Sequence, residues 1–211
     1  MEDLVVIGAG GHGAVVADSS LRAGFRIIGF LDDLAAVAPL PGYSVLGPIS
    51  LLDHSHTLNS AVKVVVAVGD NDTRMGIVRS LSFPLERYAA IIDPSARVST
   101  YATVRPGAVI LQGAIVNART LVGSHAILNT GCTVDHDCTV SEYAHISPGA
   151  NIAGGVSIGD GAHIGIGACV IPGCSIGRWS IVGAGAAVIN DIPDGVVAVG
   201  VPTRLVKALG V

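Results

Sequence analysis

The most constraining feature of this 211-residue chain is an aliphatic residue that recurs at every sixth position from Val98 to Val188, sixteen times without interruption. A period of six matches neither the repeat of about 3.6 residues of a helix nor the two-residue alternation of a strand. It is typical of a parallel β-helix, in which three hexapeptides form one triangular coil. We therefore expect about five coils, with one aliphatic residue pointing inward from each wall. The recurring residues are Val98, Val104, Ile110, Val116, Val122, Leu128, Val134, Val140, Ile146, Ile152, Ile158, Ile164, Val170, Ile176, Val182 and Val188.

The position two residues before each aliphatic residue holds a mostly small side chain, such as Ala96, Ala144 or Cys174. These small residues share the predicted interior. Half of all residues are apolar, but only 4% are aromatic. Because an interior of Val, Ile and Ala is too narrow for a substrate, any chemistry is expected on an outer wall or at a corner of the coils.

Composition and charge argue against several classes of protein. Mean hydropathy is +0.64, but Gly, Pro or polar residues interrupt every apolar run before the roughly 18 residues that a membrane-spanning helix needs. The first residues read as a strand rather than as a signal peptide. A net charge of −4 without a Lys/Arg cluster makes nucleic acid an unexpected partner.

Four cysteines occur at spacings that suit neither a zinc site nor a disulfide framework. Cys132, Cys138 and Cys174 fall in the small interior position, and Cys169 lies inside another repeat. We expect all four to be small buried residues. No metal site is predicted, and the free thiols suit a reducing, cytoplasmic setting.

The first 92 residues alternate predicted strands and helices, which indicates a small parallel α/β sheet. We expect strands over residues 4–7, 25–31 and 62–68, helices over 14–23, 49–60 and 73–81, and a loop over 35–46. Asn71 or Asp72 is the expected cap of the third helix. The predicted domains are therefore residues 1–92 and, after a boundary near Asp93, an all-β repeat domain over residues 93–211. The segment 196–204 is expected to cover the last coil.

Gly8, Gly10 and Gly13 have the G-x-G-x-x-G spacing between a predicted strand and helix. Such glycines let the backbone approach a phosphate, and the helix N-terminus offers free N–H groups. Asp32 and Asp33 end the next strand, where an acidic residue can accept hydrogen bonds from a ribose or a base. The N-terminal region has room for only one mononucleotide-binding half, which disfavours a dinucleotide site. A tight turn without a ligand remains the alternative.

Other polar residues of the N-terminal region are less specific. His12 in the glycine loop either contacts a phosphate or is simply a polar residue at a helix N-terminus. Gly69 and Asp70 end the strand over 62–68, at the sheet edge where parallel sheets bind ligands. His54 and His56 are expected to be solvated.

The unusual part of the repeats is the segment 129–138, which contains Asp135, His136 and Asp137. Counted from the inward Val134, His136 lies at a corner and points outward. Histidine is the usual general base near neutral pH. Either aspartate can orient the ring and strengthen it as a base. The alternative is a solvated corner histidine with acidic neighbours.

His145 and His163 are eighteen residues apart, which is one full coil. We expect them to stack on one wall, where they either line a groove and donate to a ligand carbonyl or form a polar ladder. His125 has no evident partner in the sequence.

Taken together, several segments resemble the sialic acid O-acetyltransferase and bacillosamine N-acetyltransferase group of hexapeptide-repeat sugar acyltransferases. They are the repeats, the glycine loop 8–13, the Asp32–Asp33 pair, the segment 69–71, the corner 129–138 and the closing 200–202. The resemblance covers essentially the whole chain. It implies a Rossmann-like domain before a left-handed parallel β-helix, assembled as a homotrimer with active sites between subunits.

The resemblance also implies roles for individual residues. His136 matches the general base, and Asp137 matches the acidic residue that strengthens it. The positions that match acetyl-CoA contacts are His145, Ile166 and Ala184. The positions that match contacts to a nucleotide-linked sugar are Gly10, Gly11, His12, Asp32, Asp33 and Gly69.

The function expected from these observations is transfer of an acetyl group from acetyl-CoA to the amino group of a nucleotide-linked 4-amino sugar. Direct attack by the amine, with His136 as base, needs no covalent acyl-enzyme. O-acetylation of sialic acid or a related sugar on the same scaffold is the nearer alternative. A non-catalytic nucleotide-sugar-binding module is the other. No residue in the sequence separates amine from hydroxyl acceptors, and none identifies the base of the nucleotide.

Overall fold

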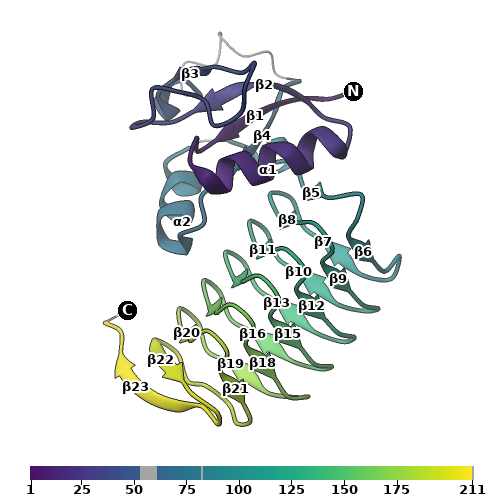
Figure 1. The fold of residues 1–211 in the computed structure, drawn as a ribbon, viewed down its shortest axis with the longest axis vertical. Helices are drawn as coiled ribbons and strands as arrows, with labels where there is room; N and C mark the ends of the chain where they lie inside the picture. The colour runs from purple at the N-terminus through teal and green to yellow at the C-terminus, as the bar shows by residue number, and fades with distance from the viewer. Residues whose placement is uncertain (53–60, 82, 211) are drawn as a thin grey trace.

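The computed structural model describes residues 1–52, 61–81 and 83–210. It consists of an N-terminal α/β domain and a parallel β-helix that extends from this domain to the C-terminal end of the chain (Figure 1). The fold class expected from the sequence is therefore confirmed. Within the described ranges, no helix combines the length and the apolar character needed to cross a membrane.

The N-terminal domain is built on a four-stranded parallel sheet with the strand order β3-β2-β1-β4. Leu4 and Val6 of the central strand enter a hydrophobic cluster with α1, whereas Val5 and Ile7 enter a second cluster on the opposite face, which α2 borders. Both faces are thus covered, as is usual for parallel sheets. The elements are β1 (Asp3–Ile7), α1 (Gly11–Arg22), β2 (Arg26–Leu31), β3 (Val45–Gly47), a 3-10 helix (Ile49–Leu52), β4 (Lys63–Val66), α2 (Asn71–Ser80) and a 3-10 helix (Leu85–Arg87).

Two predictions between the second and fourth strands need correction. The predicted loop over 35–46 ends inside β3, because the chain returns to pair with the edge of β2. The helix expected over 49–60 begins as the short 3-10 helix Ile49–Leu52. The remainder of that prediction, including His54 and His56, lies outside the described residues.

The cap of α2 also differs from the prediction. α2 begins at Asn71, and its N-cap is Asp70, whose carboxylate accepts a hydrogen bond from the backbone N–H of Thr73 at 2.9 Å. Neither Asn71 nor Asp72 is the cap. β4 ends at Val66 and α2 begins at Asn71, so a connection of four residues that ends at Asp70 leads from the strand into the helix.

Each of the sixteen hexapeptides supplies one two-residue strand, and the predicted aliphatic residue is always the second residue of that strand. The six-stranded wall contains β6 (Arg97–Val98), β9 (Ile115–Val116), β12 (Thr133–Val134), β15 (Asn151–Ile152), β18 (Cys169–Val170) and β21 (Ala187–Val188). The five-stranded wall contains β7 (Thr103–Val104), β10 (Leu121–Val122), β13 (Thr139–Val140), β16 (Ser157–Ile158) and β19 (Ser175–Ile176). The eight-stranded wall contains β5 (Ile91–Ile92), β8 (Val109–Ile110), β11 (Ile127–Leu128), β14 (His145–Ile146), β17 (His163–Ile164), β20 (Ile181–Val182), β22 (Val196–Val199) and β23 (Arg204–Ala208).

Parallel backbone ladders join residues that are eighteen positions apart, as in the pairs of β11 with β14 and of β14 with β17. The second residue of each strand points inward, and Val134 and Ile146 are fully buried. Cys132, Cys138 and Cys174 are buried in the same interior, as predicted. Cys169 is exposed, so the expectation that all four thiols are buried was wrong. As the first residue of β18, Cys169 faces outward.

The corners between the walls repeat a left-handed backbone conformation. Every sixth residue from Gly107 to Gly185 has a positive φ, which glycine adopts at little cost. Five of these positions hold other residues with φ between 56° and 62°, namely Arg119, His125, Asp137, Tyr143 and Trp179. A non-glycine residue in this conformation costs on the order of 1–3 kcal/mol, and such strain is found preferentially at functional positions.

The N-terminal domain rests on the eight-stranded wall. Val16 and Ala17 of α1 share a hydrophobic cluster with Ile91 of β5 and Val109 of β8. At the other end of α1, Arg22 donates to the buried carboxylate of Asp93 at 2.7 Å. β5 pairs with β8, so this wall begins two residues before Asp93, where the sequence placed the domain boundary.

His125 lies buried where the domains meet. Its ring stacks on Tyr143, with centroids 5.3 Å apart, and makes an edge contact with Tyr88 at 4.6 Å. Within the described residues neither ring nitrogen has a hydrogen-bond partner. Burial, and to a smaller extent the charge of Arg74, lowers the pKa of His125 to about 4.

We predict that acid destabilises the protein partly through His125. The ordinary histidine pKa is 6.5 and the folded value is about 4, so the unfolded chain binds the proton first. Stability is then fully present above about pH 6.5 and falls as the pH decreases towards 4. The share of one such histidine is roughly 2–3 kcal/mol between pH 7 and about 4.5.

Urea unfolding of the wild type and of His125→Phe at both pH values measures this share. The variant retains an aromatic ring but cannot titrate, so its unfolding free energy should change less with pH. Equal pH dependence of the two proteins would contradict the assignment.

Candidate active site

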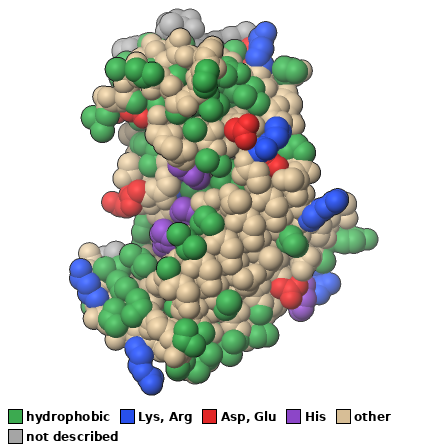
Figure 2. Space-filling view, in the orientation of Figure 1, with side chains coloured by type: hydrophobic (Ala, Val, Ile, Leu, Met, Phe, Trp, Pro, Cys, Tyr) green, Lys and Arg blue, Asp and Glu red, His purple; other side chains and the backbone are tan. Residues whose placement is uncertain are grey.

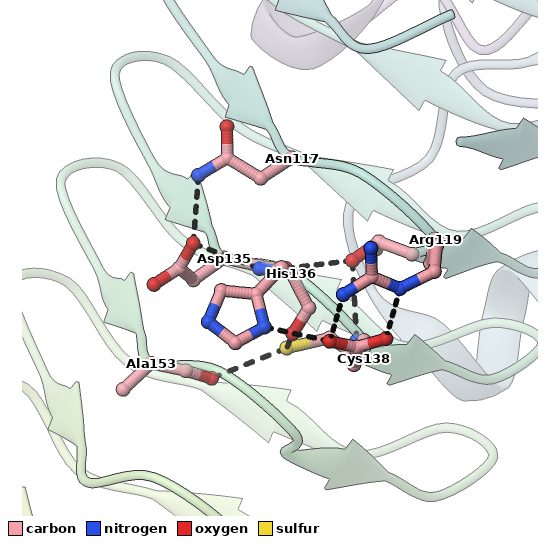
Figure 3. A network of polar contacts seen from close by, with 8 residues as sticks. Asn117, Arg119, Asp135, His136, Cys138 and Ala153 are labelled. Atoms are coloured by element: carbon pink, nitrogen blue, oxygen red, sulfur yellow. Dashed lines mark hydrogen bonds and ion pairs between the residues drawn. The ribbon is translucent and has the colours of Figure 1, made fainter. Parts of the chain in front are cut away.

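His136 lies in the corner between β12 and β13, and its side chain is 56% exposed. The ring points outward, as the hexapeptide count predicts. Its Nδ1 lies 2.7 Å from a carboxylate oxygen of Asp137 (Figure 3). The sequence left Asp135 and Asp137 as possible partners of the ring, and the structure pairs it with Asp137.

A second partner fixes the carboxylate of Asp137. Arg119, one coil earlier at the same corner, donates from Nε and Nη2 to the two carboxylate oxygens at 2.6 Å each. Arg119 first, and then His136, holds the pKa of Asp137 well below its usual range. An ionised carboxylate only accepts hydrogen bonds, so the ring of His136 carries its proton on Nδ1. The Nε2 lone pair is then free to take a proton.

Asp135 has a different task at the same corner. Its Oδ1 accepts hydrogen bonds from the backbone N–H of His136 and from Nδ2 of Asn117, both at 2.8 Å. These contacts fix the backbone of His136 rather than its ring. The thiol of Cys138 donates to the Ala153 carbonyl at 3.2 Å, and burial raises its pKa, so it is not an activated nucleophile.

The next coil leaves space for the imidazole. A Cβ at Gly154 would stand 2.7 Å from Cε1 and 2.8 Å from Nε2 of His136. Gly154 does not have a positive φ, so glycine is needed here for room rather than for backbone conformation. The absence of a side chain at Gly154 thus leaves room for the His136 ring beside the corresponding corner of the next coil.

A second group of predicted residues meets where the N-terminal domain contacts the β-helix. His145, 7% exposed, places Nδ1 3.2 Å from the Gly69 carbonyl and Nε2 3.1 Å from Nδ2 of Asn129. Because the carbonyl only accepts, Nδ1 carries the proton and Nε2 accepts from Asn129. Burial is the main cause that lowers the pKa of His145 to about 3. In this arrangement neither ring nitrogen is free to donate to a ligand carbonyl, but Asn129 retains one N–H.

His12, His145 and His163 form a row of rings. The centroids of His145 and His163 are 4.8 Å apart with nearly parallel rings, which confirms the predicted stacking on one wall. His12 lies 6.3 Å from His145, and its buried Nε2 has no partner among the described residues. Burial lowers the pKa of His12 to about 4. His163 instead contacts the Ser147 hydroxyl at 2.8 Å.

The glycine loop has a packed part and an open part. A Cβ at Gly13 would stand 2.1 Å from the Gly8 carbonyl oxygen, so these two glycines allow close packing of strand and helix. A Cβ at Gly10 or Gly11 would meet nothing within 4 Å. Gly10 is the N-cap of α1 and offers no side-chain cap. No side chain caps the first N–H groups of α1, and uncapped N–H groups at a helix N-terminus can bind an anionic group.

The two aspartates after β2 differ in how many hydrogen bonds their carboxylates accept within the protein. Asp32 accepts from the backbone N–H of Ala9 at 2.7 Å and from those of Leu34 and Ala35 at 2.8 Å, and these backbone hydrogen bonds lower its pKa. Asp32 thus also holds the glycine loop. Asp33 is exposed, and one of its oxygens accepts from the N–H of Ile49. Its other oxygen accepts no hydrogen bond from the residues that the structure describes.

Ile166 and Ala184 lie one coil apart at the corner between the eight-stranded and six-stranded walls. The carbonyl of Ile166 accepts from the N–H of Gly185 at 2.8 Å, and both side chains are exposed. His145 lies on the strand that leads to the same corner one coil earlier. The three predicted acetyl-CoA positions therefore follow one edge of the β-helix.

The predicted site residues of one chain form two separate groups. The corner of His136 joins the six-stranded and five-stranded walls and is thus opposite the eight-stranded wall. That opposite wall carries His145 and contacts the N-terminal domain. Figure 2 accordingly shows histidines in two places, at the junction of the domains and beside acidic and basic side chains at the far edge of the β-helix. One chain alone does not bring the two groups together.

Sequence reasoning missed Arg119, Asn117 and Asn129. A signal for Arg119 was present, because it occupies the corner position that glycine usually takes in the repeat. Asn117 and Asn129 follow inward residues, as many unremarkable polar residues do, and the period does not single them out. Among the described residues, no group of three or more His, Cys, Asp or Glu side chains is arranged to hold a metal ion.

We predict that Gly154→Ala displaces the imidazole of His136 and breaks its contact with Asp137. Nitrogen NMR of the neutral ring should report the Nδ1–H form in the wild type and loss of this preference in the variant. Gly76→Ala, a change on α2 with nothing within 4 Å of the new Cβ, is the control. An unchanged His136 signal in Gly154→Ala would contradict the packing described here.

Comparisons with known proteins agree with this architecture. Residues 3–81 match the family model described as the PglD N-terminal domain. Over 108 residues the chain is 39% identical to UDP-N-acetylbacillosamine N-acetyltransferase of Bacillus subtilis (strain 168). This match covers 51% of the chain and 50% of that enzyme, so it spans about half the length of the curated relative.

Two solved sugar acetyltransferase structures match nearly the whole chain. The acetyltransferase domain of PglB from Neisseria gonorrhoeae, in complex with acetyl coenzyme A, is 38% identical with a TM-score of 0.89, over 97% of this chain and 99% of that one. PerB from Caulobacter crescentus, in complex with CoA and GDP-perosamine, is 35% identical with a TM-score of 0.87, over 98% of both chains. The chain therefore belongs to the hexapeptide-repeat sugar acyltransferase family that includes the acetyltransferase domain of PglB and PerB.

Proposed function

We propose that this protein transfers the acetyl group of acetyl-CoA to the amino group of a nucleotide-linked 4-amino sugar. The observation that carries the proposal is the corner at which Arg119 and Asp137 hold His136 with a free Nε2. The names of the relatives support the same reaction class, since they include sugar N-acetyltransferases and complexes with acetyl coenzyme A and with GDP-perosamine.

In the proposed reaction the sugar amine attacks the thioester carbon directly. The new C–N bond forms while Nε2 of His136 takes the proton that the amine loses. The C–S bond then breaks, and the thiolate of CoA leaves and receives that proton. Asp137 keeps the ring in the Nδ1–H form and stabilises the imidazolium that arises. Holding donor and acceptor together supplies a further part of the rate.

The two groups of site residues are assigned to the two substrates. Acetyl-CoA binds along the edge marked by His145, Ile166 and Ala184. The spare N–H of Asn129, held by His145, is the group placed to donate to the acyl carbonyl. The nucleotide-linked sugar binds to residues 1–92, at Gly10, Gly11, His12, Asp32, Asp33 and Gly69. Residues 93–211 hold the coenzyme and the base.

We further propose a homotrimer with active sites between subunits. Because His136 faces away from the wall that carries His145, the base of one chain acts on substrates held by its neighbour. A closed ring of identical contacts uses the same two surfaces on every chain. A cytoplasmic location completes the proposal, since the four free cysteines suit a reducing compartment.

We predict that His136→Ala lowers kcat by roughly 10²–10⁴, the usual share of a general base. Thiol release from acetyl-CoA measures the rate with UDP-, dTDP- and GDP-linked 4-amino sugars, alongside free and CMP-linked sialic acids. Turnover of one amino sugar by the wild type and its loss in the variant is the expected result. Turnover of sialic acids only would replace N-acetylation by O-acetylation, and a loss below fivefold would remove His136 as the base.

We also predict that two inactive variants restore activity when mixed. His136→Ala and His145→Ala chains, unfolded together and refolded as random trimers, should regain about a quarter of the wild-type sites, since each mixed trimer contains one intact pair. Each variant refolded alone is the control. Activity no higher than that of the separate variants would contradict sites shared between chains.

A further inference from the structure

A single buried guanidinium joins the two domains beside the proposed sugar site. Arg74 of α2 is 1% exposed. Its Nε donates to the carbonyl of His125 at 2.9 Å, and its Nη2 donates to the carbonyl of Tyr143 at 2.7 Å. Both acceptors are corner residues of the β-helix in the left-handed conformation. The strained corners therefore present their carbonyl oxygens to this one side chain.

The same guanidinium also holds its own domain. Nη1 donates to the carbonyls of Val68 and Gly69 at 2.8 and 3.2 Å, and Nη2 donates to Oδ1 of Asn71 at 2.7 Å. Asn71 in turn donates to the carbonyl of Gly161 in the β-helix at 3.0 Å. The segment that ends β4 and starts α2 is thus fixed to the β-helix from two sides.

Arg74 is unusual because its described partners are carbonyl oxygens and no carboxylate. Burial lowers its pKa to about 10, so it remains charged at neutral pH. A planar guanidinium carries five N–H donors spread over three nitrogen atoms, whereas a lysine ammonium carries three donors on a single nitrogen and cannot reach acceptors so widely spaced. Arg22, at the C-terminal end of α1, differs from Arg74 because it pairs with a carboxylate, that of Asp93.

The position of these contacts gives Arg74 a second role. The carbonyl of Gly69 accepts from Arg74 and also from Nδ1 of His145. Gly69 is a proposed sugar contact, and His145 marks the proposed coenzyme edge. The carbonyl of Gly69 thus connects the residues of the proposed sugar site with those of the proposed coenzyme site. The position of this carbonyl depends on Arg74.

We propose that Arg74 is a positioning residue that fixes the Gly69 segment against His145, so that the sugar and coenzyme sites keep one relative geometry. The expected effect on the KM for the sugar rests on the proposed function. The expected effect on the segment 68–71 does not. Arg74 touches neither proposed substrate. Its loss should therefore affect the sugar site through the segment 68–71.

The test compares Arg74→Lys and Arg74→Gln with Arg22→Gln. The control also removes a guanidinium contact between the domains, but at the far end of the twelve-residue α1. Hydrogen–deuterium exchange of the peptide over residues 66–73, corrected for global unfolding, is the first readout. The second is the KM for the nucleotide sugar against the KM for acetyl-CoA.

Exchange of residues 66–73 should accelerate in both Arg74 variants and stay at the wild-type rate in Arg22→Gln. The sugar KM should rise roughly 10- to 100-fold in Arg74→Gln, the range expected for a displaced binding group, and less in Arg74→Lys. Two results would overturn the inference, whether or not the wild type acetylates a sugar. One is an exchange rate of residues 66–73 in Arg74→Lys that equals the wild-type rate. The other is an exchange rate in Arg22→Gln that rises as much as it does in the Arg74 variants. A wild type without turnover would refute the proposed function and leave the exchange result to decide the role of Arg74.

Discussion

Backbone hydrogen bonds between residues eighteen positions apart are the interaction on which the rest of this molecule depends. They require each hexapeptide to lie directly above the one three repeats earlier in the sequence. This stacking is maintained because every hexapeptide places one aliphatic and one small residue in the interior. The interior is then closed to ligands. Function has to be carried by the corners and by whatever covers a wall, and the described site residues are found in those two places.

The covered wall and the opposite corner divide the chemistry between them. The eight-stranded wall carries the N-terminal domain, His145 and Gly69, and the opposite corner carries His136. The geometry of a triangular coil keeps these groups apart within one chain. An assembly of identical chains is thus the simplest way to combine an exposed base with a binding site, and the proposed function depends on it.

Much of the fold could be predicted from the sequence, because a period of six repeated sixteen times leaves no freedom of register. All sixteen repeat strands and the stacking of His145 on His163 follow from counting. The outward position of His136 follows in the same way. The edge strand β3 and the cap at Asp70 did not follow. β3 depends on where the chain returns to the sheet, and the cap depends on where the chain turns into α2 after β4.

The site was less predictable because its contacts join different coils and different domains. Arg119 reaches Asp137 from eighteen residues away, and Arg74 reaches Tyr143 from another domain. The repeat nevertheless contains a pattern that indicates where site residues lie. Its left-handed corner position is glycine except at five residues, and four of these lie at the His136 corner or at the domain junction.

The most direct test of this account is a crystal structure with CoA and a nucleotide-linked amino sugar bound together. We expect the sugar nitrogen to lie within about 2.6–3.2 Å of Nε2 of His136 from one chain, while Gly69 and His145 of the neighbouring chain contact the same ligands. A sugar amine bound beside His145, with no His136 from any chain within reach, would contradict it.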